Sequence, residues 1–174
     1  MSDERMPGPA LPQDPTEQSL WRPVFGLLSE MDREIARIYA ENGIADLKPS
    51  WVTVIIRLHA RGPKTIADLA RSLDHTHSAM SQKVAAMRAA GWVETSPGPD
   101  ARSKKVTLTA KAEQIAGRLA AEWRATEASV AEIEAEMPYP LTRAAADVAA
   151  VLARKSFHDR IAEKLAADPA WTDS

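Results

Sequence analysis

Side chains that can bind an anion are concentrated in the middle of this 174-residue chain. Between Arg61 and Lys111, nine lysines and arginines stand against four acidic residues, a net charge of +5, whereas the remainder carries −7. A basic stretch inside a chain of overall net charge −2 indicates a localised surface that binds a polyanion. The alternative interpretation is a chance fluctuation of solvated surface charge.

Other kinds of chemistry lack the residues they need. The chain has no cysteine, which excludes disulfides, thiolate nucleophiles and thiolate metal ligands. His75 and His77 could suggest a metal site, but side chains two residues apart at a helix start point in different directions, and a third ligand is needed. The sequence also has no glycine-rich phosphate loop, no His-Glu-x-x-His motif and no serine elbow. We therefore expect a protein that is not an enzyme and uses no metal or cofactor.

The composition is that of an ordinary globular protein, with 45% hydrophobic and 26% charged residues. No apolar run approaches the roughly 18–20 residues that a membrane span needs, and the first residues lack the basic-then-apolar order of a signal peptide. We therefore expect a cytoplasmic protein that does not bind membranes. Residues 1–15 are rich in proline and poor in apolar residues, which predicts a mobile arm.

Apolar periodicity predicts long helices on both sides of the basic stretch. Over residues 16–42 apolar side chains recur every three or four positions, which is typical of an amphipathic helix. A helix capped by Thr109 should reach Met137, and Pro138 should end it because proline removes a helical hydrogen bond. A last helix should then span about residues 141–165.

Shorter helices are predicted between these long ones. Pro49 suits the first turn of a helix that should end before Gly62. Thr65 with Asp68 three residues later resembles a capping box, although Asp replaces the commoner Glu or Gln, and the helix it begins should run to about Ser72.

A tight turn and another helix follow. Asp74 sits in the turn, where Asp tolerates the left-handed conformation better than most residues after glycine. Thr76 can cap a helix that Gly91 ends. The inward face of this helix carries Met80, Val84 and Met87, and the opposite face carries residues 77, 78, 81, 82, 85 and 88.

Two strand candidates, Trp92–Thr95 and Val106–Leu108, come next and are joined by a turn-rich loop. A short helix, a tight turn, a longer helix and a hairpin form the order of a winged helix-turn-helix. Ala70 is the small residue where the two helices cross, and Met80 is the core anchor ten residues later. In this arrangement the longer helix lies in the major groove of duplex DNA.

The stretch from Leu47 to Ala112 resembles the MarR family of bacterial winged-helix repressors. The similarity runs without gaps through LARSLDHTHSAMSQKVAAMRAAGWVET and continues through the wing, PDARSKKVTLTAKA. The wing's Asp-x-Arg element is Asp100-Ala101-Arg102, and the usual Leu-Thr start of the following helix is Leu108-Thr109.

The resemblance implies a mainly α-helical fold with a small β-hairpin wing. It implies a homodimer and a double-stranded DNA operator as partners, and a function as a transcription regulator, most simply a repressor. The domains expected are an arm (1–15), an N-terminal dimerisation helix (16–46), the winged helix-turn-helix (47–109), C-terminal dimerisation helices (110–168) and a tail (169–174). A winged helix that binds protein instead of DNA is the alternative.

Carried over position by position, the resemblance assigns three groups of residues. The recognition helix would present Thr76, His77, Ser78, Ser81 and Gln82 to DNA. The wing would contribute Arg102, Lys104 and Lys105, with Asp100 orienting Arg102. The dimer interface would include Leu20, Val24, Leu27, Val148, Val151 and Leu152.

Two further expectations concern positions where the chain is unusual. The five tryptophans should be core and interface residues, but Trp21 and Trp51 could border a pocket for a small aromatic or phenolic effector. His75 and Lys83 occupy places that more often carry apolar residues. Lys83 is expected to lay its stem on the edge of the core and send its amine outward.

Overall fold

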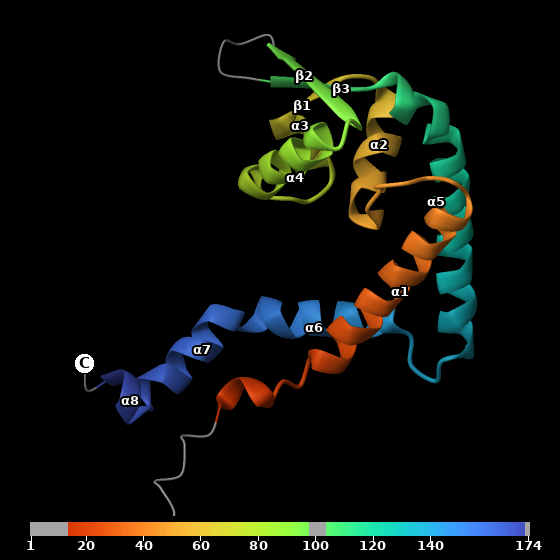
Figure 1. Ribbon diagram of the computed structural model, residues 1–174. Coiled ribbons are helices and arrows are strands. Elements are labelled where there is room, and N and C mark those ends of the chain that lie inside the picture. Colours follow the sequence, from red (N-terminus) through yellow and green to blue (C-terminus); the bar gives the residue numbers. More distant parts are fainter. Residues whose placement is uncertain (1–13, 98–103, 173–174) are drawn as a thin grey trace, which may run out of the picture. The chain divides into compact units, whose positions relative to one another are not determined.

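The computed structural model describes residues 14–97 and 104–172 (Figure 1). The chain divides into two compact units, Met1–Ala116 and Gly117–Ser174. The first unit contains α1 (Arg22–Glu41), α2 (Pro49–Arg61), β1 (Lys64–Thr65), α3 (Ile66–Ser72), α4 (His77–Ala89), β2 (Val93–Pro97) and β3 (Lys104–Leu108). The long helix α5 (Ala110–Glu136) crosses the boundary between the units, and the second unit continues with α6 (Leu141–Arg154), α7 (Phe157–Ala166) and α8 (Pro169–Thr172).

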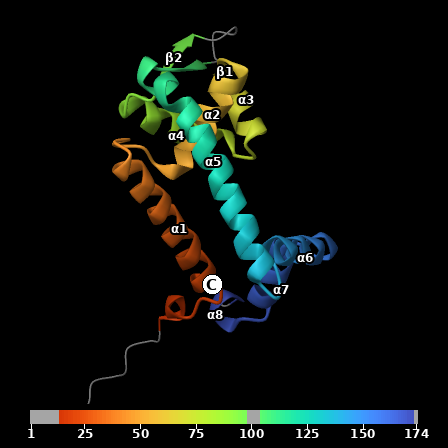
Figure 2. The same ribbon diagram turned by 90° about the vertical axis from the view of Figure 1, so that its right-hand side faces the viewer.

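Helices α2, α3 and α4 and the three strands form what we call the winged-helix lobe. Its antiparallel sheet has the order β1-β3-β2 and packs against all three helices (Figures 1 and 2). The β2–β3 hairpin was predicted, whereas β1 was not. This strand is only two residues long, and it exists because Lys64 and Thr65 pair with Val106 and Lys105, forty or more positions away. The predicted class, mainly helical with a small wing, is confirmed.

The core of the lobe is built from the apolar faces of its helices and strands. Leu69, Met80 and Met87 are fully buried, as is Val106 from β3. Trp92 is 1% exposed, and its indole N–H donates to the carbonyl of Asp46 (3.1 Å). This contact satisfies the one polar atom of a large core side chain.

Helix α1 is shorter than predicted. It begins at Arg22 rather than near residue 16, with Pro23 in its first turn. Proline has no N–H to donate and its ring clashes with the preceding turn, so a helix can contain it only at its start. Upstream of it, Pro15–Glu17 form a 3₁₀ turn capped by Asp14, whose carboxylate accepts from the Thr16 amide (2.8 Å).

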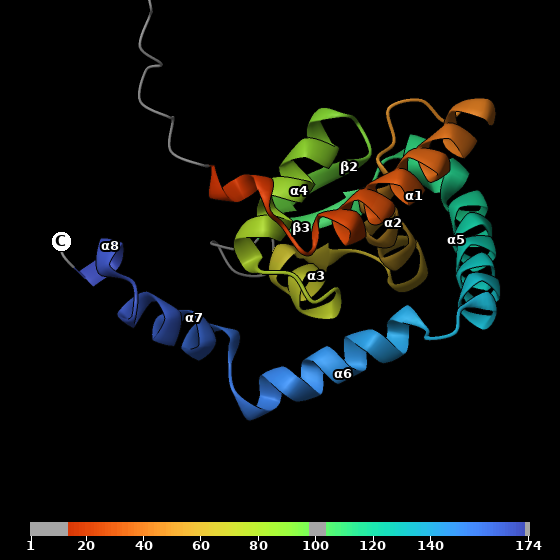
Figure 3. The ribbon, with the colours of Figure 1, turned by 90° about the horizontal axis from the view of Figure 1, so that it is seen from below.

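The prediction of a single last helix over about residues 141–165 is also wrong, because the chain forms two helices there, α6 and α7 (Figure 3). Lys155 adopts an extended conformation, and Ser156 caps α7 by accepting from the Asp159 amide at 3.0 Å. A serine with an acidic residue three positions later is a helix start signal, and here it interrupts the apolar periodicity. Pro169 then begins α8 inside the segment that was expected to be a tail.

Within the described parts of the chain, none of the helices combines the length and apolarity that crossing a membrane would require. Within the same parts, no group of three or more His, Asp or Glu side chains is placed to hold a metal ion.

Candidate nucleic-acid interface

Both helices of the helix-turn-helix begin at a threonine cap. The Thr65 hydroxyl oxygen accepts from the Asp68 amide (3.1 Å), and the hydroxyl donates to one carboxylate oxygen of Asp68 (2.8 Å). This hydrogen bond, together with the positive charge of Arg71, holds the pKa of the Asp68 carboxyl below its ordinary value. Thr76 accepts from the Ala79 amide (3.2 Å) and so begins α4 as predicted.

The turn between α3 and α4 has the predicted geometry. Asp74 adopts a φ of +53°, the left-handed conformation that reverses the chain. The amide of His75 donates to the carbonyl of Ala70 (2.9 Å), which ties the turn back to α3. Ala70 is 5% exposed, and a small side chain there allows the two helices to approach closely. Two separate helices therefore cross at this point.

Helix α4 has one buried and one solvent-facing side. Met80, Val84 and Met87 are buried in the core of the lobe. Thr76, His77, Ser78 and Gln82 are exposed, and Ser81 is half-buried. The structure thus brings all five predicted recognition residues onto one accessible polar surface.

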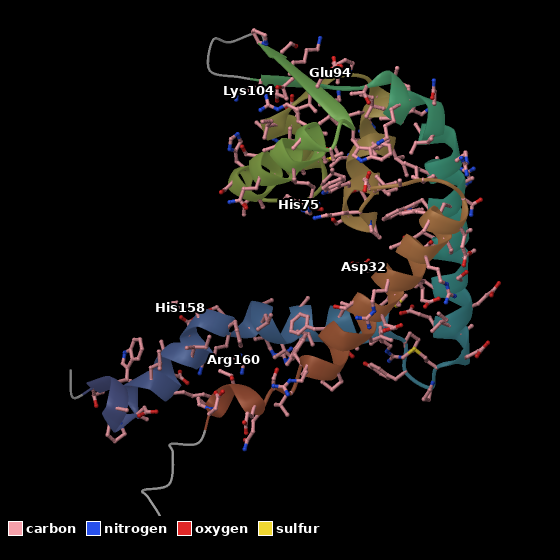
Figure 4. The ribbon with its side chains drawn as sticks, in the orientation of Figure 1. Asp32, His75, Glu94, Lys104, His158 and Arg160 are labelled. Atoms are coloured by element: carbon pink, nitrogen blue, oxygen red, sulfur yellow. The ribbon has the colours of Figure 1, made fainter. Side chains whose placement is uncertain are left out.

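The wing contributes positive charge from the sheet. Lys104 and Lys105 are both exposed at the start of β3, and Lys104 lies opposite Pro97 in the hairpin (Figure 4). Asp100 and Arg102, the other predicted wing residues, lie outside the described residues.

The prediction for Lys83 is wrong about its amine, which does not simply point outward. Lys83 Nζ donates to the carbonyl of Ser50 (3.0 Å) in the first turn of α2 and lies 2.8 Å from Nε2 of His75. Partial burial lowers the pKa of the Lys83 amine. The two polar residues at usually apolar positions therefore satisfy each other and connect α4 and the turn to α2.

The two tryptophans predicted to border an effector pocket have different environments. Trp51 is 6% exposed in α2, with the Lys48 amine 5.3 Å from its ring. Trp21 is 54% exposed and directly precedes α1. It lies about 27 Å along the helix axis from Tyr39, the buried residue near the other end of α1. In Figures 1 and 2 the first turn of α1 is the end farther from α2, so the structure does not bring the two rings together.

The residues predicted to form a dimer interface are all exposed in the single chain. Leu20 precedes α1, and Val24 and Leu27 lie on it. Val148, Val151 and Leu152 share one side of α6 in the second unit.

One basic cluster was not singled out from the sequence. Arg57 and Arg61 at the end of α2, Lys64 in β1 and Arg71 in α3 line a common surface hollow. Only the general excess of positive charge after residue 61 could have pointed to it, because the residues come from three different elements, α2, β1 and α3.

Comparison with known proteins finds one matching family model and solved structures with a similar fold. Residues 45–103 match the family model described as MarR family. A DNA complex of S. aureus MepR matches with a TM-score of 0.58 and 16% identity, covering 79% of this chain and 99% of the MepR chain. A DNA complex of M. tuberculosis MosR matches with a TM-score of 0.54 and 20% identity, covering 77% of this chain and 93% of the MosR chain. No curated protein matches the chain.

Proposed function

We propose that this chain, whose residues 45–103 match the model of the MarR family, is a sequence-specific DNA-binding transcription regulator. It acts as a homodimeric repressor on a pseudo-palindromic operator. Two-fold symmetry then places the half-sites about one helical turn, roughly 34 Å, apart.

The observation that carries this proposal is the exposed polar face of α4. The apolar side of α4 is buried in the core of the lobe, and the first turn of the helix, after its cap at Thr76, is open to solvent. A helix held by one side and polar on the other is what entry into a major groove requires. The structures of MepR and MosR that share this fold were both solved with DNA, which supports the same ligand for this chain.

The side chains of α4 differ in the contacts they can make. Gln82 can pair bidentately with an adenine, and Ser81 can hydrogen-bond to several base edges. Thr76 and the free amides of the first turn suit a backbone phosphate. His77 and Ser78 also lie in that first turn, and the proposed docking would bring them to the base edges.

The wing would hold the flanking backbone. Lys104 and Lys105 supply charge for phosphate contacts. We assign Arg102 to the minor groove, where narrow A·T tracts concentrate negative potential, and Asp100 to orienting Arg102.

The dimer would form through apolar side chains that the single chain leaves exposed. Val24 and Leu27 on α1 are 37% and 49% exposed, and Val148, Val151 and Leu152 on α6 are 38%, 38% and 37% exposed. Apolar side chains clustered on one side of a helix mark an interaction surface. A second copy of the chain would cover them.

The salt dependence of duplex binding tests the function. Consensus duplexes are first selected from a random-sequence pool by the unsubstituted chain, and affinity is then measured by fluorescence anisotropy over a range of salt concentrations. Each phosphate contact should lower the logarithm of affinity by roughly 0.9 per logarithmic unit of salt. Absence of any duplex binding at low salt would contradict the proposal and favour a winged helix that binds protein.

A further inference from the structure

A hollow of about 220 Å³ opens on the winged-helix lobe beside the helix-turn-helix. It is lined by Arg57 and Arg61 from α2, Lys64 from β1, and Asp68, Arg71 and Ser72 from α3. Four of these six side chains are cations and one is a carboxylate. None of the six is aliphatic or aromatic, whereas pockets for small organic ligands are lined mainly by such residues. The lining therefore favours an anion over an aromatic effector.

The single carboxylate in the hollow, that of Asp68, already accepts hydrogen bonds from neighbouring side chains. One oxygen of Asp68 accepts from the Thr65 hydroxyl (2.8 Å) and the other accepts from Arg71 Nη1 (3.1 Å). Arg57 Nη1 donates to the carbonyl of Ser72 (2.9 Å), which fixes this guanidinium at the end of α3. Two of the cations are thus held in place by contacts within the lobe, and each retains further N–H donors.

The other two cations, Arg61 and Lys64, have no acidic partner among the described residues. Across residues 14–97 and 104–172, neither Arg61 nor Lys64 forms an ion pair. Their charges add to those of Arg57 and Arg71, so an incoming anion would meet a net charge of +3 from the lining. Guanidinium groups match phosphate oxygens in geometry as well as in charge.

The hollow lies beside the sheet that carries the basic strand of the wing, because β1, which supplies Lys64, pairs with β3. Lys64 and Thr65 form β1, and Thr65 lies directly opposite Lys105 of β3. Strand β1 is the edge strand in the order β1-β3-β2, so Lys64 lies one strand away from Lys104 and Lys105 of the central strand β3. The phosphates of one DNA strand recur every 3.4 Å along the helix axis, so a backbone held by the wing can continue past β1.

We propose that this hollow binds a phosphate group of the DNA backbone outside the half-site read by α4. Arg61 and Lys64 supply the free charge, and Arg57 and Arg71 supply oriented donors. The site lengthens the footprint on DNA without reading sequence, because phosphate contacts position a protein but do not discriminate bases. The inference rests on the proposed function.

The test removes the two unpaired cations in the full-length chain. The Arg61→Ala/Lys64→Ala variant is titrated with the selected consensus duplex in two lengths. One duplex ends at the outer edges of the half-sites, and the other extends by about 10 bp on each side. On the long duplex the variant should lose about 10-fold in affinity, and its salt slope should fall by roughly 1–2. On the short duplex the variant and the unsubstituted chain should bind alike.

A matched control separates the hollow from general charge. Arg33→Ala/Arg37→Ala removes the same formal charge from exposed positions on α1, where both arginines already pair with glutamates. It should leave the difference between the long and the short duplex unchanged. Circular dichroism of each variant shows whether it is folded, and Arg61→Gln/Lys64→Gln repeats the test with longer polar side chains.

Each other outcome overturns the inference. Equal losses of affinity on both duplexes would show that the hollow does not contact DNA outside the half-sites. Unchanged affinity on both duplexes would show that the hollow does not contact DNA. Titration with inorganic phosphate and pyrophosphate addresses a free anion. If these ions protect the unsubstituted chain but not the variant against heat, while DNA binding is the same for both, the site serves a free anion instead. If the unsubstituted chain binds no duplex, the proposed function itself fails, and this inference fails with it.

Discussion

Gln82 and Thr76 lie within two turns of each other on α4, yet they offer a duplex different contacts. The Gln82 amide is a donor and an acceptor in one plane, which matches the edge of adenine. The hydroxyl oxygen of Thr76 already accepts a hydrogen bond from the Ala79 amide. What this residue offers to DNA is therefore mainly the start of the helix. We therefore expect sequence preference to depend on Gln82 and affinity for any sequence to depend on the helix start and the wing.

Substitution of Gln82 by alanine should change base preference. We expect a loss of about 1–3 kcal/mol on the preferred operator, little change on variants altered at the contacted base, and the same salt slope. Binding to a set of single-base operator variants measures this. Gln114→Ala, at an exposed position on α5, is the control. A uniform loss over all operator variants would contradict direct readout by Gln82.

Substitutions of Asp74 test how much the stability of the turn depends on a single backbone angle. Its φ of +53° is costly for a side chain branched at Cβ, so Asp74→Val should lower the free energy of unfolding by about 1–2 kcal/mol. Asp74→Gly should change the free energy of unfolding by less than about 1 kcal/mol. Glycine adopts the positive φ without strain, but this gain is offset by the larger conformational entropy that glycine loses on folding. Urea unfolding followed by circular dichroism measures both variants. Equal effects of valine and glycine would show that the angle is unimportant.

At the scale of secondary-structure elements, the carboxylate of Asp68 at the start of α3 predicts that stability depends on pH. The folded-state pKa of Asp68 lies below its ordinary value, so its hydrogen bonds stabilise the folded chain above pH 4 and are lost as the pH falls through the lowered pKa. The difference in unfolding free energy between the unsubstituted chain and Asp68→Asn should therefore be constant near pH 7 and shrink towards zero below about pH 4. Denaturation curves at several pH values test this.

Asp32→Asn, at an exposed position on α1, is the control for that experiment. It should leave the pH dependence of the unsubstituted chain as it is. A difference for Asp68→Asn that stays the same from pH 7 to pH 2 would contradict the assigned cause of the shift.

The elements that could be predicted from the sequence are those specified by neighbouring residues. Thr65, Asp74, Thr76 and Gly91 each fix a start, a turn or an end within a few positions, and the structure has all four features. The strand β1 could not be predicted, because two residues carry no periodicity and the pairing partner lies in the wing.

The features of the candidate interface also divide into those specified by neighbouring residues and those that depend on distant ones. The exposed side of α4 follows from helical spacing alone. The bond from Lys83 to the carbonyl of Ser50 spans 33 positions, and the basic hollow joins α2 to α3. Such contacts depend on how helices pack, which the spacing of residues in one helix does not specify.

For the molecule as a whole, the decisive expectation is the homodimer. Leu152→Asp places a charge on the apolar side of α6, and an uncompensated buried charge costs about 3–5 kcal/mol. The dimer dissociation constant should rise by about 100-fold or more, and operator affinity should fall because one lobe contacts only one half-site. Analytical ultracentrifugation measures the association state.

Ala150 lies on the opposite side of α6 from Val148 and Leu152, so Ala150→Asp is the matched control. It should leave the dimer intact. A monomeric unsubstituted chain that still binds a palindromic operator tightly would contradict the proposed assembly.

The pairing of β1 with β3 has a mechanical consequence. It fastens the capped start of α3 to the strand that carries Lys104 and Lys105, while the bond from Lys83 to Ser50 fastens α4 to α2. Helix α4 and the wing therefore move as one rigid body, because tilting the wing alone would break the hydrogen bonds between β1 and β3. In the proposed dimer, a signal that releases the operator would therefore act outside the winged-helix lobe and change the separation of the two lobes.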